Sequence, residues 1–306
     1  GPTEQRFGLM LARGKWPGRV ALLARSGVWD FRLDRALGRD GGKVRGLISY
    51  VRAGPDGGAN PKALFDQAWY IEQNPDLAGS RWAPLAHYLI AGDKEGRAPH
   101  PLFDLKDYRA RNAVKIAATG LTALQHFLHK GVREGYAPHP LFDVRYYVGQ
   151  AEEVADSGEN PLIHYLREGW RKGYQPHPLF NGDWYLATNP DVAETGAAPL
   201  LHYVTSGAAE GRSPHPLFEP AWYADRYRDV APMGSSALAH FLTYGHEERR
   251  DPSAHFDTSY YLDQQPEAPT DVHPLVHYLT EGAFEGVSPA ADFSEVSYLL
   301  ENPQAA

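Results

Sequence analysis

Residues 199–230 read PLLHYVTSGAAEGRSPHPLFEPAWYADRYRDV, and this stretch returns along the chain with small changes. The Phe of the stretch marks the period, with gaps of 38, 39, 38, 38, 38 and 37 residues between successive copies. The copies are Phe65, Phe103, Phe142, Phe180, Phe218, Phe256 and Phe293. A period of roughly 20–50 residues indicates stacked supersecondary repeats rather than one globular core.

The first half of the quoted stretch predicts a short helix. Its pattern, P-L-x-H-Y-L-x-x-G, is present at 84–92. Proline in the first turn and glycine just past the last turn are the usual ends of a helix. Leu85, Tyr88 and Leu89 form an apolar stripe at helical spacing. Further copies lie at 161–169, 199–207 and 274–282, with looser ones at 46–54, 123–131 and 237–245.

The repeated Phe predicts the start of another helix. The residue after it is Asp, Asn or Ser in six of the seven copies, with Glu219 as the exception, and these are preferred N-cap residues. A Tyr follows the Phe by five residues in every copy. Phe65 and Tyr70 therefore have the N′ and N4 spacing of a hydrophobic staple, which sets the angle between the helix and the preceding chain.

Together these patterns predict an all-α fold, an α-solenoid of two-helix repeats of about 38 residues each. We expect residues 1–28 to form a basic N-terminal segment or cap, and residues 29–306 to form the solenoid. The repeats are expected to begin near 29, 65, 103, 142, 180, 218 and 256, the first of them degenerate, with a closing half-unit at 293–306.

The composition narrows the range of functions. The 306 residues include no Cys, which argues against disulfides and zinc–thiolate sites and suits a reducing, cytoplasmic setting. No stretch has the roughly 18–20 apolar residues of a transmembrane helix.

Charge is distributed unevenly along the chain. Residues 1–52 hold 11 Lys/Arg and 4 Asp/Glu, a net of +7, and the remainder holds 19 and 34, a net of −15. An acidic body repels nucleic acid, so no nucleic-acid partner is expected. The basic residues within 13–45, including Arg19 and Arg25, have two open roles, which are contact with an anionic surface and a solvated end cap.

One histidine recurs inside the helical pattern. Equivalent residues on neighbouring helices lie about 8–10 Å apart or more, whereas zinc needs its ligands at about 2 Å, so this row predicts no metal site. We expect each ring to bond backbone or a cap of the adjoining repeat. The row comprises His87, His126, His164, His202, His240 and His277.

Two other rows are candidate ligand-binding residues. The first has a His in the sequence Pro-His-Pro-Leu-Phe, and is formed by His100, His139, His177 and His215. The second has an aromatic residue just before the repeated Tyr, and is formed by Trp69, Tyr146, Trp184, Trp222 and Tyr260. Because Asp107 takes this place in one repeat, we expect the aromatic position to be partly exposed. Exposed aromatic faces suit sugar rings or partner side chains, and the alternative is a seam between repeats covered by aromatic rings.

No enzyme signature is present. The chain lacks the nucleophile elbow, the phosphate-binding loop, the dinucleotide fingerprint and the zinc-protease motif. Catalysis needs one unique constellation, whereas the unusual residues here recur in rows. We therefore expect no catalytic residue, no cofactor and no metal.

The repeat, clearest at 161–193 and 199–230, resembles one found in bacterial, often alphaproteobacterial, polysaccharide-biosynthesis proteins, beside glycosyltransferase domains. The resemblance covers about 29–306 and implies a setting of glycan assembly without supplying catalytic positions. The expected function is a non-catalytic scaffold that docks a partner protein in surface-polysaccharide assembly. The alternatives are a glycan-binding module and an auxiliary domain that holds the acceptor of a glycosyltransferase.

Overall fold

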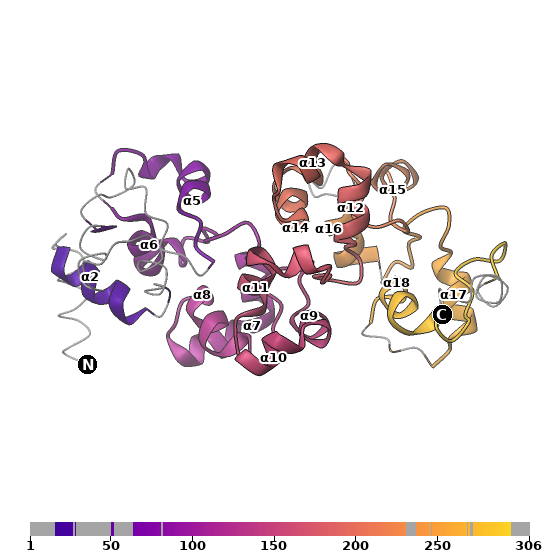
Figure 1. Cartoon of the computed structure of the whole chain (residues 1–306), viewed down its shortest axis with the longest axis horizontal. Helices are drawn as coiled ribbons and strands as arrows, with labels where there is room; N and C mark the ends of the chain where they lie inside the picture. Colours follow the sequence, from indigo (N-terminus) through magenta and orange to yellow (C-terminus); the bar gives the residue numbers. More distant parts are fainter. Residues whose placement is uncertain are drawn as a thin grey trace. The chain divides into compact units, whose positions relative to one another are not determined.

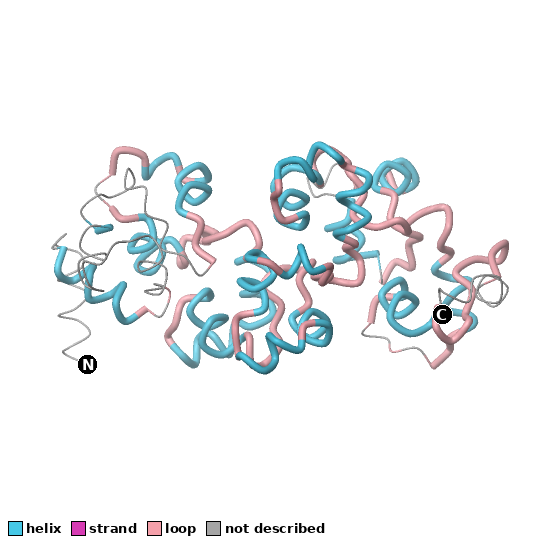
Figure 2. The backbone as a smooth tube through the Cα atoms, in the orientation of Figure 1, coloured by secondary structure: helices cyan, strands magenta, loops and turns pink. Residues whose placement is uncertain are grey.

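The structure is a computed structural model that describes residues 16–26, 28, 50–51, 64–80, 82–230, 237–245, 247–267, 269 and 272–294. Throughout these ranges every regular element is a helix, with no strand, which confirms the all-α prediction (Figure 2). The chain divides into two compact bodies, and each is described by itself. The first body comprises residues 1–139 and 159–163, and the second comprises 140–158 and 164–306.

The first body holds two of the repeats predicted from the Phe spacing (Figure 1). Helix α7 changes direction at Asn112, which has non-helical backbone angles. The elements are α2 (Trp16–Arg25), α5 (Gln67–Gln73), η2 (Pro75–Leu77), α6 (Pro84–His87), η3 (Tyr88–Gly92), α7 (Leu105–Thr119), α8 (Ala123–His126) and η4 (Phe127–Gly131).

The second body continues the same order of elements, and α11 (Pro161–Arg167) has residues assigned to both bodies. In the repeats that begin at Phe142 and Phe180 it contains α9 (Val144–Gln150), α10 (Glu152–Ser157), η5 (Gly169–Lys172), α12 (Gly182–Thr188), α13 (Pro190–Thr195), α14 (Pro199–His202) and η6 (Tyr203–Gly207). In the following repeats it contains α15 (Pro220–Arg226), α16 (Ala237–His240), η8 (Phe241–Gly245), α17 (Thr258–Gln264), α18 (Pro274–His277) and η9 (Tyr278–Gly282).

The loop expected between the two helices of a repeat contains a further helical segment. Pro75 and Pro190 begin η2 and α13, and α10 occupies the same place after α9. Proline is favoured at the first helical position because its missing N–H would have no partner there. The repeats that begin at Phe65, Phe142 and Phe180 therefore have a third helical segment, which the two-helix prediction did not include.

The N-caps form as the sequence predicts. The side chain of the residue after the Phe accepts a backbone N–H from the first turn in α5, α7, α9, α12 and α17. Glu219, the non-standard residue at this position, makes no such bond at the start of α15. A cap of this kind satisfies an N–H that the helix itself leaves without a partner.

The staple pairs form the core of each repeat. The six Phe residues from Phe65 to Phe256 are at most 1% exposed, and the Tyr residues that follow them are fully buried. Their ring centroids lie 5.0–5.6 Å apart, at the spacing of favourable aromatic pairs. Phe293, the last copy, is 40% exposed.

The glycine that ends the P-L-x-H-Y-L-x-x-G pattern has a different role from the one expected. Gly92 is the last residue of the π-helical turn η3, and the next residue keeps right-handed helical angles. The left-handed glycine comes four residues later, at Gly96. A Cβ atom on Gly92 would overlap the hydroxyl of Tyr70, so space rather than backbone angle requires glycine here.

One backbone hydrogen bond recurs between successive connections. We call each Pro-x-Pro-Leu-Phe-like segment before a first helix a junction. The N–H of Asp143 donates to the carbonyl of Pro176 in the next junction, and Asn181 donates in the same way to Pro214. Six such bonds are 2.9–3.1 Å long. Within each body, consecutive junctions therefore lie side by side.

The N-terminal helix α2 packs against α6 of the first body. Arg19 is only 7% exposed, and its guanidinium lies 3.9 Å from the ring centre of Trp82. Arg19 is therefore unsuited to contact an anionic surface, whereas Arg25 is exposed. The other basic residues of 13–45 lie outside the described residues, as do most of the degenerate repeat expected to begin near 29 and most of the closing half-unit.

Candidate functional site

The histidines of the helical pattern are bonded inside their own repeat. In each described repeat, Nδ1 of the histidine lies 2.5–3.0 Å from the hydroxyl of the staple tyrosine, as in Tyr70–His87. We expected each ring to bond backbone or a cap of the adjoining repeat, and this prediction was wrong. A buried hydroxyl and a buried imidazole satisfy each other in this arrangement, so this row consists of structural residues.

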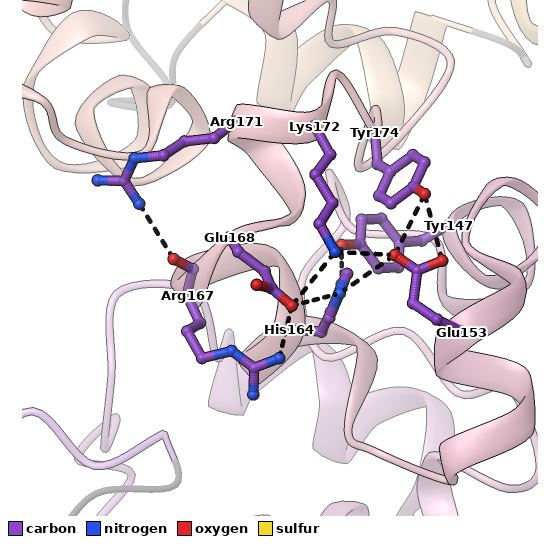
Figure 3. A network of polar contacts seen from close by, with 8 residues as sticks. All are labelled: Tyr147, Glu153, His164, Arg167, Glu168, Arg171, Lys172 and Tyr174. Atoms are coloured by element: carbon purple, nitrogen blue, oxygen red, sulfur yellow. Dashed lines mark hydrogen bonds and ion pairs between the residues drawn. The ribbon is translucent and has the colours of Figure 1, made fainter. Parts of the chain in front are cut away.

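The repeat that begins at Phe142 contains a polar network, shown in Figure 3. The Tyr147 hydroxyl lies 2.7 Å from Nδ1 of His164, whose Nε2 lies 3.2 Å from Glu168 and 3.6 Å from Glu153. Lys172 donates to Glu153 at 3.1 Å and lies 3.4 Å from Glu168. The cluster thus combines a histidine, two carboxylates and a lysine, which are groups able to move protons.

The charges of this cluster are already paired. A hydrogen bond from Arg167 is the main cause that lowers the pKa of Glu168, and a backbone hydrogen bond followed by Lys172 lowers the pKa of Glu153. Both carboxylates are therefore ionised at neutral pH and are poor general acids. His164 is 1% exposed and Tyr147 is fully buried, so no substrate reaches either ring. The network therefore links segments of the repeat to one another, and we call such a set of polar contacts a tie.

Other repeats make a corresponding tie with arginine. Arg212 donates to Asn189, Asp191 and Glu210 at 2.5–2.9 Å, and Arg97 makes the same set of contacts in the first body. Where Tyr136 or Tyr174 replaces this Arg, a lysine replaces one of the two acids, Lys115 or Lys172. Lys172 stands at the position of Glu95, three residues after the pattern glycine, and its contact with Glu153 keeps this position paired within the repeat. The paired Asn-Pro-Asp and Glu-Gly-Arg motifs were the sequence signal for this tie.

The aromatic row is partly exposed, as the sequence indicated. All five members, Trp69, Tyr146, Trp184, Trp222 and Tyr260, have intermediate exposure. Each stands at the N3 position of its helix, directly before the buried staple tyrosine. In four of the helices, the exception being that of Trp222, its backbone N–H donates to the N-cap side chain. The backbone is fixed by the cap, and the ring remains available at the surface.

The junction histidines form turns. Nδ1 of His100, His177 and His215 accepts the backbone N–H two residues later, at 3.0–3.1 Å. The proton of each neutral ring is therefore on Nε2. His100 and His215 are buried at 8% exposure, whereas His139 and His177 are half-buried. Desolvation by burial lowers the pKa of His100, His139 and His215 to about 4, so these rings are uncharged at neutral pH.

The second body brings three of the candidate residues to one pocket. Its volume is about 140 Å³, and it is lined by Tyr146, Gln175, His177, Pro178, Asn181 and His215 among others. Trp184, Trp222 and Tyr260 are not among its lining residues. Gln175 and Asn181 were not predicted, because the positions before Pro and after Phe vary among repeats in ways that also fit solvent exposure or capping.

No family model, no curated protein and no solved structure matches the chain. Over the ranges that the structure describes, no group of three or more His, Asp or Glu side chains is placed to hold a metal ion. Within those same ranges, no helix has both the length and the apolar character needed to cross a bilayer.

Proposed function

We propose that the chain is a non-catalytic helical-repeat scaffold, an α-solenoid, that docks a partner protein in bacterial surface-polysaccharide assembly. The observation that carries the proposal is that the repeated residues differ in burial. The staple Phe, the staple Tyr and the helical His are joined by ring contacts and a hydrogen bond inside each described repeat, and in five of these six repeats the pattern Gly adjoins the same Tyr. The aromatic row at the N3 position is the recurring large apolar feature that stays partly exposed.

The recurring junction bond supports stacking of the repeats. It joins each junction to the next by the same donor and acceptor within both bodies. Repeats that contact mainly their neighbours build extended surfaces, which such proteins use to bind partners. Partly exposed Trp and Tyr side chains are also the residues most enriched at the centres of protein interfaces.

Site-specific photocrosslinking in the native cell tests the proposal. A photoreactive phenylalanine analogue at Trp184 or Trp222 is expected to capture glycosyltransferase or polysaccharide-transport proteins. The same analogue at Val114, which is 84% exposed and outside the aromatic row, serves as the control. Capture of no such protein from either aromatic position, or equal capture from Val114, would overturn the proposal.

A further inference from the structure

The pocket of the second body is built where two neighbouring junctions and one helix start meet. The bonds from Asp143 to Pro176 and from Asn181 to Pro214 place those junctions in consecutive order. His177 and His215 stand directly after these two prolines. Tyr146 comes from the first turn of α9, whose cap at Asp143 fixes its backbone. The pocket residues are therefore held by the same bonds that hold the repeats.

Gln175, which lines the pocket, is held in place by hydrogen bonds to neighbouring residues. Its side-chain oxygen accepts the N–H of Gly182 at 2.6 Å, and its side-chain nitrogen donates to the carbonyl of Gly173 at 3.0 Å. Its backbone N–H donates to Gln150 at 3.0 Å. Because these bonds fix Gln175 in one position, its ordering adds little to the cost of binding.

The polar side chains that line the pocket are hydrogen-bonding groups. The turn bond from Leu217 leaves the ring N–H of His215 on Nε2. Asn181 uses its side-chain oxygen for the cap of α12, and its amide NH₂ is a further donor. Tyr146 and Pro178 add apolar faces beside these donors. A ligand that fits has acceptor oxygens on one side and a ring face on the other.

The charges around the pocket disfavour anionic ligands. The lining includes no Lys or Arg, and the low pKa of His215, caused by burial, keeps that ring neutral. Two carboxylates are bonded to lining residues, because Asp183 accepts from the Gln175 side chain and Asp143 accepts the Tyr146 backbone N–H, each at 3.0 Å. An anion would meet no Lys or Arg here, and burying an unpaired charge is costly. The volume, about 140 Å³, is well below the roughly 300–1,000 Å³ of sites for drug-sized molecules, so one ring fits.

We infer that this pocket binds one uncharged sugar ring, with a ring face against Tyr146 and hydroxyl groups accepting from His215 and Asn181. The inference does not depend on the scaffold proposal, because photocrosslinking measures the binding of a protein partner and NMR titration measures the binding of a sugar. The sequence register offers an internal control. Trp184 is the equivalent of Tyr146 one repeat later, but Ser253 replaces the second histidine there, and Trp184 does not line the pocket.

The experiment uses the full chain with methyl glucoside, methyl galactoside, methyl mannoside and N-acetylglucosamine as neutral probes, and glucuronate as the acidic probe. Saturation-transfer NMR and titration are expected to detect at least one neutral probe. Tyr146→Ala and His215→Asn should each weaken that binding about tenfold or more. Asn at 215 still accepts the Leu217 N–H as an Asx turn, so the fold is retained while the ring donor is lost. Trp184→Ala should leave the affinity unchanged.

Three results would overturn the inference. The first is no transfer from any neutral probe, and the second is an unchanged affinity in both pocket variants while melting curves confirm their folding. The third is tighter binding of glucuronate than of every neutral probe. If the photocrosslinks are absent while a neutral sugar still binds the pocket, only the scaffold proposal is contradicted.

Discussion

The hydroxyl of Tyr147 occupies the space that a side chain on Gly169 would need. The same hydroxyl bonds His164 at 2.7 Å, so three residues of one repeat share a single contact point. Equivalent overlaps with the staple tyrosine occur at Gly92, Gly131, Gly207 and Gly282. The repeated Tyr, His and Gly therefore pack as one unit in these repeats, and the position of the Tyr hydroxyl leaves room only for glycine.

Gly169→Ala is expected to lower the free energy of unfolding by about 1–3 kcal/mol, because the methyl group must displace a buried ring. Combining it with Tyr147→Phe should cost less than the sum of the two single changes, since the clashing oxygen is gone. Gly149→Ala is the matched control, because its Cβ would meet open space in an exposed part of α9. Chemical denaturation measures all four variants, and equal effects at 169 and 149 would refute the packing account.

Asp143→Ala is expected to destabilise the chain by about 1 kcal/mol through loss of the cap on α9. The lost bonds are those from the N–H groups of Arg145 and Tyr146, at 2.8 and 3.0 Å. Glu219→Ala provides the comparison, because Glu219 holds the same position at α15 without a side-chain cap bond. Thermal melts should separate the two variants, and an equal loss from both would contradict the capping role.

Phe142→Ala is expected to cost about 3–5 kcal/mol, because it leaves a cavity beside the Tyr147 and Tyr165 rings. Phe284→Ala, at a side chain that is 69% exposed, should change stability little. The comparison is made by urea denaturation followed by circular dichroism. A negligible effect of Phe142→Ala would show that the staple does not hold the repeat.

Stability is expected to fall as the pH is lowered from about 6.5 towards 4. Burial lowers the pKa of His100, His139 and His215 to about 4 in the folded chain, while an unfolded histidine has a pKa near 6.5. In that window the unfolded chain binds more protons, so acid favours unfolding.

His100→Asn isolates this effect, because Asn keeps the turn acceptor and does not titrate. Its melting temperature should drop less between pH 7 and pH 5 than that of the parent chain. His255→Asn, at a side chain that is 73% exposed, is the comparison variant. An identical drop in the parent and in His100→Asn would contradict the burial argument.

Local interactions explain which expectations held. The caps and the Phe–Tyr staples depend on residues within five positions of one another, so spacing alone identifies them. The partial exposure of Trp69 and its equivalents followed from the Asp that replaces them at Asp107. These features need no knowledge of how segments pair across the repeat.

Contacts between segments explain the expectations that failed. The partner of each helical histidine lies 16–18 residues away, and the arginine tie spans 21–23 residues. Chain spacing does not say which side chains meet over such distances. The same limit hid Gln175 and Asn181, whose place in the pocket depends on two junctions lying side by side.

The amino-acid sequence by itself determined the period, the helical class, the caps and the staple, because those are set by local hydrogen bonding and by the spacing of apolar residues. The tertiary structure decided why the pattern glycine is glycine, which histidines are already bonded, and where Tyr146, His177 and His215 meet. The physical reason is that steric exclusion and burial act between segments distant in the chain, and their outcome exists only once those segments pack.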